Sequence, residues 1–289
     1  MRRVIVIVGA RLDSSGRRGW LDSFRRSFVP HVSPRVYWIL RRILCVFAPL
    51  IYAVRSGQVR SAVTGKVVDR HGSPLPWLTY PAIDFLGSLD YSGKKVLEFG
   101  SGYSTLWWAE RADSVTSLEA DQRWMESMAG KTPANATVLA LPTDPNDRFH
   151  RTVNVDAFLA EHIGGQQFDV IVIDGVDRVG TARAALPYLA DHGIFVTDNS
   201  DTYVQGDGGM PLLDIFREAS MKRVDFYGLG PSILFPQCTS IMFRDGAFAF
   251  DGEQNTIWLK PFERNRYGDV KFHSGFTAVA DAGTAERTR

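Results

Sequence analysis

The sequence predicts an α/β fold: a doubly wound, mostly parallel sheet with helices on both faces. From residue 95 onward, short apolar runs alternate with stretches of helical length and periodicity, the order expected of linked strand–helix–strand units. One run, Phe168–Ile173, is almost entirely apolar, as in a parallel strand that is buried on both faces. These two observations carry the prediction.

The predicted elements follow one another with short turns. A helix over residues 81–89 opens the series, because Pro81 suits a first helical turn. Strands are predicted at 95–99, 114–118, 136–141, 168–173, 193–197, 224–227 and 239–244, and helices at 105–111, 122–130, 155–163, 181–189 and 210–220. We expect the last two strands to form an antiparallel pair at the sheet edge.

The chain divides into three predicted parts. Residues 1–73 form an N-terminal extension with an apolar helix, residues 74–245 the α/β domain, and residues 246–289 a C-terminal extension. A loop at 69–76, with one glycine and two prolines, marks the first boundary. The end of the chain, from residue 278, is predicted to be disordered.

Composition narrows the class of protein. With 289 residues, 45% hydrophobic and 22% charged, the chain has the makeup of a soluble globular protein whose core needs no disulfide or structural metal. A net charge of +1 gives no general reason to expect a nucleic acid partner. The two cysteines, Cys45 and Cys238, belong to no CxxC motif, so we predict reduced thiols, no zinc site and a cytoplasmic location.

The segment 36–54 has unusually many aromatic and aliphatic residues. Arg41 and Arg42 interrupt it, and the remaining apolar run, 43–54, is shorter than the roughly 20 residues of a spanning helix. We favour a helix packed on the core or across a homodimer. The alternative is a peripheral membrane contact, with the apolar side in lipid and the arginines at the head groups.

The turn after the first strand is the first candidate site. Glycines at 100 and 102 let a ligand approach the backbone, and the following helix start offers free amide donors. The dinucleotide motif requires a third glycine at position 105, which is threonine here. Glu98 suits a ligand's amino group. The candidate cofactor contacts from this turn are Glu98, Gly100, Ser101, Gly102, Ser104 and Thr105.

Carboxylates after the next strands extend the candidate site. Glu119, followed by Ala120, ends the second strand 19 residues after Gly100, where a carboxylate can accept both hydroxyls of a ribose. This feature alone does not separate NAD from S-adenosylmethionine. After the third strand, Asp144 is a candidate acceptor for an adenine amino group.

At this point the sequence resembles a family. The segments 96–102, 117–119 and 168–175 are similar, in order, to the motifs of class I S-adenosylmethionine-dependent methyltransferases, and the likeness spans 74–244. The resemblance implies the Rossmann-like methyltransferase fold, a seven-stranded sheet with an antiparallel last strand. It also implies S-adenosylmethionine as cofactor, with Asp174 among its contacts.

A narrower resemblance concerns Asp174, Asp198 and Asn199, at the ends of two neighbouring strands. They resemble the magnesium ligands of the catechol O-methyltransferase type, in which the ion positions and acidifies a substrate hydroxyl. The catalytic lysine of that type is absent. Asp174 and Asp177 are therefore the predicted catalytic residues, with Asp177 as a substitute base. In the alternative, Asp174 contacts only the cofactor and 198–199 cap a loop.

The predicted function is methyl transfer from S-adenosylmethionine to the hydroxyl of a small molecule, assisted by Mg²⁺. Metal-free methylation of a nitrogen or a carboxylate is the alternative among enzymes. A non-catalytic scaffold with the same fold is the alternative from another class, and an NAD oxidoreductase is disfavoured by Thr105. The chain contains no Gly-x-Ser-x-Gly motif, so acyl transfer has no support.

Overall fold

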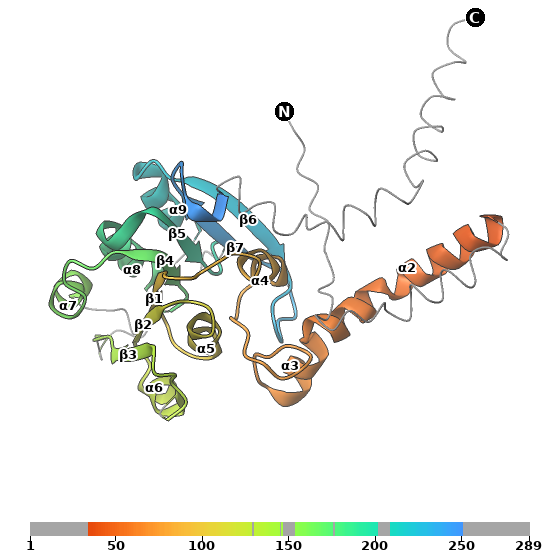
Figure 1. The fold of residues 1–289 in the computed structure, drawn as a ribbon, viewed down its shortest axis with the longest axis horizontal. Coiled ribbons are helices and arrows are strands. Elements are labelled where there is room, and N and C mark those ends of the chain that lie inside the picture. The colour runs from red at the N-terminus through yellow and green to blue at the C-terminus, as the bar shows by residue number, and fades with distance from the viewer. Residues whose placement is uncertain are drawn as a thin grey trace, which may run out of the picture.

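The fold is built on one seven-stranded sheet, which the computed structural model shows with the strand order β3-β2-β1-β4-β5-β7-β6 (Figure 1). The model describes residues 34–128, 130–144, 146, 154–175, 177–201 and 209–250. The strands are β1 (Lys95–Phe99), β2 (Ser114–Glu119), β3 (Ala136–Ala140), β4 (Phe168–Ile173), β5 (Leu189–Thr197), β6 (Lys222–Gly228) and β7 (Gln237–Phe243). The predicted Rossmann-like methyltransferase fold is confirmed.

Strand β7 alone runs against the others. Strands β1 to β5 pair in parallel, whereas β7 pairs antiparallel with β5 on one side and with β6 on the other. The antiparallel pairing of the last two strands is therefore correct, but β7 lies inside the sheet and β6 forms its edge. Burial explains this order, because the middle five residues of β7 are all buried while β6 alternates between exposed and half-buried positions.

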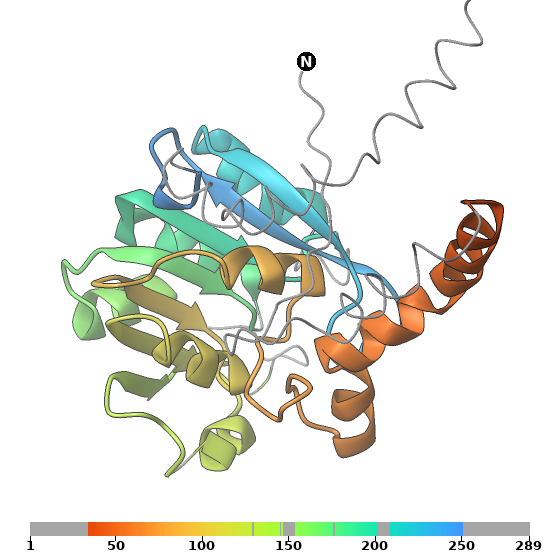
Figure 2. The ribbon, with the colours of Figure 1, turned by 45° about the vertical axis from the view of Figure 1, so that its right-hand side comes forward.

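Helices cover both faces of the sheet (Figures 1 and 2). On one face, Trp107 and Trp108 pack against strand residues such as Val96 and Val170, and on the other Leu159 and Phe216 are in the core. This alternation follows from the period of two along a strand. The helices of the domain are α4 (Tyr80–Leu86), α5 (Tyr103–Ala109), α6 (Gln122–Met128), α7 (Val155–His162), α8 (Arg178–Ala185) and α9 (Gly209–Glu218).

Helix α8 begins three residues earlier than predicted. We expected a helix at 181–189, but α8 begins at Arg178 because the Asp177 carboxylate caps it by accepting from the Gly180 amide at 3.1 Å. It ends at Ala185, and a short 3₁₀ turn over Leu186–Tyr188, with Pro187 inside it, leads into β5. Strand β5 consequently begins at Leu189, four residues before the predicted start.

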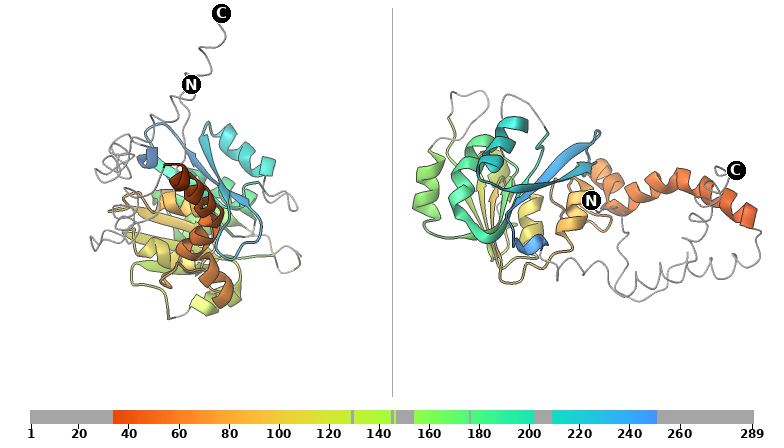
Figure 3. Two further views of the ribbon diagram at one scale, coloured as in Figure 1. Left: turned by 90° about the vertical axis from the view of Figure 1, so that its right-hand side faces the viewer. Right: turned by 90° about the horizontal axis from the view of Figure 1, so that it is seen from above.

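Helices α2 (Pro34–Ser56) and α3 (Gln58–Thr64) form the described part of the N-terminal extension. Helix α3 is anchored to the domain, because the Gln58 side chain donates to the Ile233 carbonyl at 3.0 Å and accepts from the Tyr80 hydroxyl at 3.1 Å. Helix α2 projects away from the domain (Figure 3), so its predicted packing on the core is wrong. No helix among the described residues is long and apolar enough to cross a membrane. The predicted disordered end, from residue 278, lies outside the described residues.

Candidate active site

A cavity of about 770 Å³ opens beside the carboxyl ends of β1, β2, β4 and β5. Parallel strands bring these ends to one edge of the sheet, where α/β proteins bind their ligands. The cavity is lined by the β1–α5 turn, by the start of α6 and by residues after β4 and β5. The lining residues are Val67, Trp77, Gly100, Ser101, Gly102, Tyr103, Ser104, Glu119, Ala120, Asp121, Gln122, Arg123, Trp124, Asp174, Gly175, Arg178, Asp198, Asn199, Ile233 and Gln237.

The glycine at position 100 is required by the neighbouring backbone. Gly100 has φ +106°, and a Cβ atom there would lie 2.7 Å from the carbonyl oxygen of Asp174. The amide of Gly100 donates to the Leu118 carbonyl at 2.8 Å, and the amide of Asp174 donates to the Phe99 carbonyl at 3.0 Å. Gly100 thus lets the β1–α5 turn lie directly against the loop that follows β4, so that both border the cavity.

Glu98 lies behind this turn, outside the cavity wall. The hydroxyls of Thr105 and Ser117 each donate to its Oε2 at 2.6 Å, and the Gly102 amide donates to the Thr105 hydroxyl at 3.1 Å. Its Oε1 is buried and has no hydrogen-bond partner among the described residues. Burial raises the pKa of Glu98. Glu98 and Thr105 therefore support the turn on its buried side, whereas Ser101 and Ser104 line the cavity.

Glu119 does line the cavity and also holds the turn. Its Oε2 accepts from the amide of Ser101 at 2.6 Å and from the Ser101 hydroxyl at 2.8 Å, and its Oε1 accepts from the Asp121 amide at 2.8 Å. A carboxylate has about four acceptor positions, so one remains for a ligand. Trp124, 43% exposed, contributes an aromatic surface to the same wall.

The remaining predicted cofactor contacts divide in the same way. Ala120 lies in the cavity wall beside Glu119. Asp144 lies outside the lining set, and its carboxylate accepts from the Asn146 amide at 2.8 Å within its own turn. The structure thus brings together the turn after β1 and the end of β2, but it leaves Asp144 outside this group.

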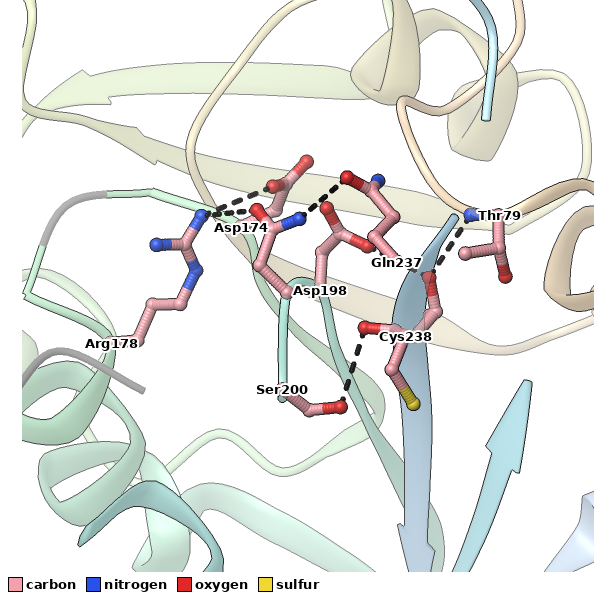
Figure 4. A network of polar contacts seen from close by, with 9 residues as sticks. Thr79, Asp174, Arg178, Asp198, Ser200, Gln237 and Cys238 are labelled. Carbon is pink, nitrogen blue, oxygen red and sulfur yellow. Dashed lines mark hydrogen bonds and ion pairs between the residues drawn. The ribbon is translucent and has the colours of Figure 1, made fainter. Parts of the chain in front are cut away.

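Two of the three predicted metal ligands, Asp174 and Asn199, contact the guanidinium group of Arg178 (Figure 4). Arg178, in the first turn of α8, lies 3.9 Å from Asp174 Oδ1 and donates to Asn199 Oδ1 at 3.0 Å. The Asn199 amide nitrogen donates to Gln237 Oε1 at 3.0 Å, and the Thr239 hydroxyl donates to Asp198 Oδ1 at 2.7 Å. The sequence analysis missed Arg178, although its spacing of four residues from Asp174 is a usable signal.

These residues do not fit a magnesium site. Magnesium requires oxygen ligands with near-octahedral geometry, and the Asn199 oxygen is already used by Arg178. The guanidinium supplies positive charge beside Asp174 at the place where the resemblance implied the ion. In the part of the chain that the structure describes, no group of three or more His, Cys, Asp or Glu side chains is arranged to hold a metal.

Burial dominates the electrostatics of the two aspartates. It raises the pKa of Asp198 to about 6, against the opposing effects of the Thr239 hydrogen bond and of Arg178. Burial also raises the pKa of Asp174, and the neighbouring Asp198 raises it further. The cavity wall carries four carboxylates, on Glu119, Asp121, Asp174 and Asp198, but two guanidiniums, on Arg123 and Arg178. It therefore favours a cationic ligand.

Asp177 does not lie where the predicted base would act. It has φ +55°, caps α8, and is outside the set of residues that line the cavity. Its carboxylate accepts from the Gly180 amide, and its carbonyl accepts from the Thr181 hydroxyl at 2.9 Å. Asp177 therefore belongs to the helix start, and the carboxyl groups that the ends of β4 and β5 bring to the cavity are those of Asp174 and Asp198.

The strand order and the single antiparallel strand define the Rossmann-like fold of class I methyltransferases. No family model and no curated protein matches the sequence. Among solved structures, cofactor-bound Rv0187 from MTB is similar with 16% identity and a TM-score of 0.46, over 68% of this chain and 94% of that one.

Two further solved structures show a weaker likeness. Spermidine synthase from Thermotoga maritima has 16% identity and a TM-score of 0.37, and covers 56% of this chain. The chain spans 57% of the length of that synthase. The N-methyltransferase NodS from Bradyrhizobium japonicum WM9, in complex with S-adenosyl-L-homocysteine, has 15% identity and a TM-score of 0.36, over 53% of this chain and 79% of that one.

Proposed function

We propose that this protein is an S-adenosylmethionine-dependent methyltransferase that acts on a small molecule. The observation that carries the proposal is the excess of carboxylates in a cavity bordered by a glycine turn at the strand ends. S-adenosylmethionine carries a sulfonium and an ammonium cation, which this wall would attract. NAD carries an anionic pyrophosphate, which the same carboxylates would repel.

Different residues of the cavity would bind different parts of such a cofactor. Glu119 keeps one acceptor position for a ribose hydroxyl, and the Trp124 ring offers a surface for an adenine base. Asp174, with a carboxyl group at the cavity, would accept from the cofactor's amino group. This role replaces the one we predicted for Glu98, which is fully buried behind the turn.

Bound S-adenosylmethionine supplies an electrophilic methyl group on sulfur. The protein then has to orient the acceptor and to take up the proton that the acceptor loses. Asp198 suits the second task, because a pKa of about 6 leaves most of its carboxyl groups ionised at neutral pH. Asp198 thus takes the role that we predicted for Asp177, without a metal ion.

A hydroxyl remains the proposed acceptor. The acidic cavity wall supports a second candidate, an amine, because a cationic amine would be drawn to the same carboxylates that attract the cofactor. An amine would also give up a proton to Asp198. Mass spectrometry of the methylated product, with a hydroxyl compound and an amine compound offered together, distinguishes the two acceptors.

The cofactor is tested by calorimetry with S-adenosylhomocysteine and NAD. We expect S-adenosylhomocysteine to bind and Glu119→Ala to weaken it by about 1–3 kcal/mol, from lost charged hydrogen bonds. The matched control is Glu126→Ala, which removes the same charge from an exposed position on α6 outside the cavity. Binding of NAD without binding of S-adenosylhomocysteine would overturn the proposal.

A further inference from the structure

Helix α2 is amphipathic, and the large residues on its apolar side are exposed, with no helix or strand of the described residues packed over them. At about 100° per residue, its large aliphatic residues and Phe47 fall within an arc of roughly 160°, whereas Trp38 and Tyr52 lie on the opposite side. Each residue within the arc is between 44% and 75% exposed. They are Val36, Ile39, Leu40, Ile43, Leu44, Val46, Phe47, Leu50, Ile51 and Val54, and we refer to them as the α2 apolar face.

The other side of α2 carries its positive charges and its contact with the domain. Arg41, Arg42 and Arg55 fall outside the arc, with the Arg41 guanidinium 5.1 Å from the centre of the Trp38 ring. The Tyr52 ring, on this side, meets the Tyr80 ring edge to face at 6.0 Å. The α2 apolar face is therefore turned away from the domain, and the helix contains no Asp or Glu.

A second exposed apolar group lies between α3 and the cavity. In the loop between β6 and β7, Leu234 is 81% and Phe235 is 73% exposed. This loop is fixed to α3, because the Gln58 side chain donates to the Ile233 carbonyl at 3.0 Å and accepts from the Ser232 amide at 2.9 Å. Ile233 lines the cavity, so the exposed Leu234 and Phe235 follow directly on a residue of the cavity wall.

We propose that α2 lies in the head-group region of an anionic membrane, with its apolar face in the lipid. A helix with a wide apolar arc and only cationic charges matches such a surface in both polarity and charge. A symmetric dimer through α2 would account for the apolar face but not for the charge, because it would place the arginines on its outer sides, away from the contact between the two copies.

The test is flotation of the full chain with lipid vesicles. We expect binding to phosphatidylcholine vesicles that contain about one third phosphatidylglycerol, and at least about tenfold weaker binding to phosphatidylcholine alone. Phe47→Asp, on the α2 apolar face, should weaken binding to the anionic vesicles more than about tenfold. Ala48→Asp is the matched control, because it adds the same charge at the next position, on the side of the arginines.

Two measurements accompany the flotation. S-adenosylhomocysteine affinity should be the same in Phe47→Asp and in the unchanged protein, so this test fails or succeeds separately from the proposed function. Sedimentation velocity gives the oligomeric state. The proposal is overturned if the anionic vesicles do not bind the protein, if Phe47→Asp binds them undiminished, or if the chain forms a dimer that only Phe47→Asp dissociates.

Discussion

At Asp198, burial and hydrogen bonding act on one carboxyl group in opposite directions. Burial favours the neutral form, whereas the Thr239 hydroxyl and the Arg178 guanidinium favour the ionised form, and the resulting pKa is about 6. A carboxyl group in that range is ionised at neutral pH but binds a proton more strongly than an ordinary aspartate. A general base needs a group that is ionised but binds a proton readily, and Asp198 has both properties. Burial of its charge lowers the free energy of unfolding at neutral pH.

The pH dependence of stability follows from this raised pKa. Between pH 4 and 6 the folded state binds more protons at Asp198 than the unfolded state, so the free energy of unfolding falls as pH rises through this range. Asp198→Asn removes the cost of burying the charge. We expect it to stabilise the protein by about 1–3 kcal/mol at pH 8, with little effect at pH 4.

Urea unfolding at the two pH values measures this difference, and the methyl transfer rate of Asp198→Asn should fall at least about a hundredfold. Destabilisation by Asp198→Asn that is larger at pH 8 than at pH 4 would contradict this account, because it would show that the ionised Asp198 carboxylate stabilises the native state. The pH profile of the unchanged enzyme should rise with a midpoint near 6.

The Arg178 guanidinium lies where the resemblance implied a metal ion, so the site should need no metal. We expect methyl transfer to continue at an unchanged rate in excess EDTA. Arg178→Met should slow it more than about tenfold, since Asp174 and Asn199 lose their cationic partner. Arg183→Met, an exposed change on the same helix, is the control. An activity that EDTA abolishes and magnesium restores would contradict this reading of the site.

At the scale of the element, the β1–α5 turn is held by contacts from three sides. Glu98 accepts a hydrogen bond from the Thr105 hydroxyl on the buried side of the turn, and Glu119 accepts from the Ser101 amide. The loop after β4 lies against Gly100. Each contact comes from a different strand end. The turn is thus shaped by the sheet before any ligand arrives, which reduces the ordering that binding requires.

Gly100→Ala should disrupt this element. The new Cβ would meet the Asp174 carbonyl oxygen at 2.7 Å, and alanine is strained at φ +106°. We expect a loss of more than about 2 kcal/mol in the free energy of unfolding and a parallel loss of S-adenosylhomocysteine affinity. Gly165→Ala is the control, because its Cβ would have no atom within 4 Å. Equal melting temperatures for the two variants would refute the account.

The sequence predicts where strands lie and end better than it predicts their neighbours in the sheet or the hydrogen-bond partners of the residues at their ends. The apolar run of β4 identifies a buried strand, and the turns after β1 and β2 follow from the alternation. The place of β7 between β5 and β6 depends on burial of both its faces, which a seven-residue segment does not reveal. The partners Ser117 and Thr239 were missed for the same reason, since each meets its carboxylate across strands.

At the scale of the whole molecule, ligand binding and stability are linked. The cavity draws its walls from the ends of four strands, so a bound ligand would stabilise the folded domain as a unit. S-adenosylhomocysteine at a hundred times its dissociation constant should add about 2.7 kcal/mol to the free energy of unfolding. We expect a rise of roughly 5–10 °C in the melting temperature, and none with NAD at equal concentration. Differential scanning calorimetry measures both, and a larger shift with NAD would contradict the cofactor assignment.

The position of β7 also has a consequence for biosynthesis. Strand β6 has no neighbour in the sheet until β7 is available to pair with it, and Thr239 on β7 supplies the hydrogen bond to Asp198. A ribosome adds roughly 5–20 residues per second, and the first five strands leave it well before β7 does. During that interval the nascent chain has an open edge at β5 and an incomplete site. Synthesis of β7 therefore completes both the sheet and the hydrogen bonding of Asp198 at the cavity.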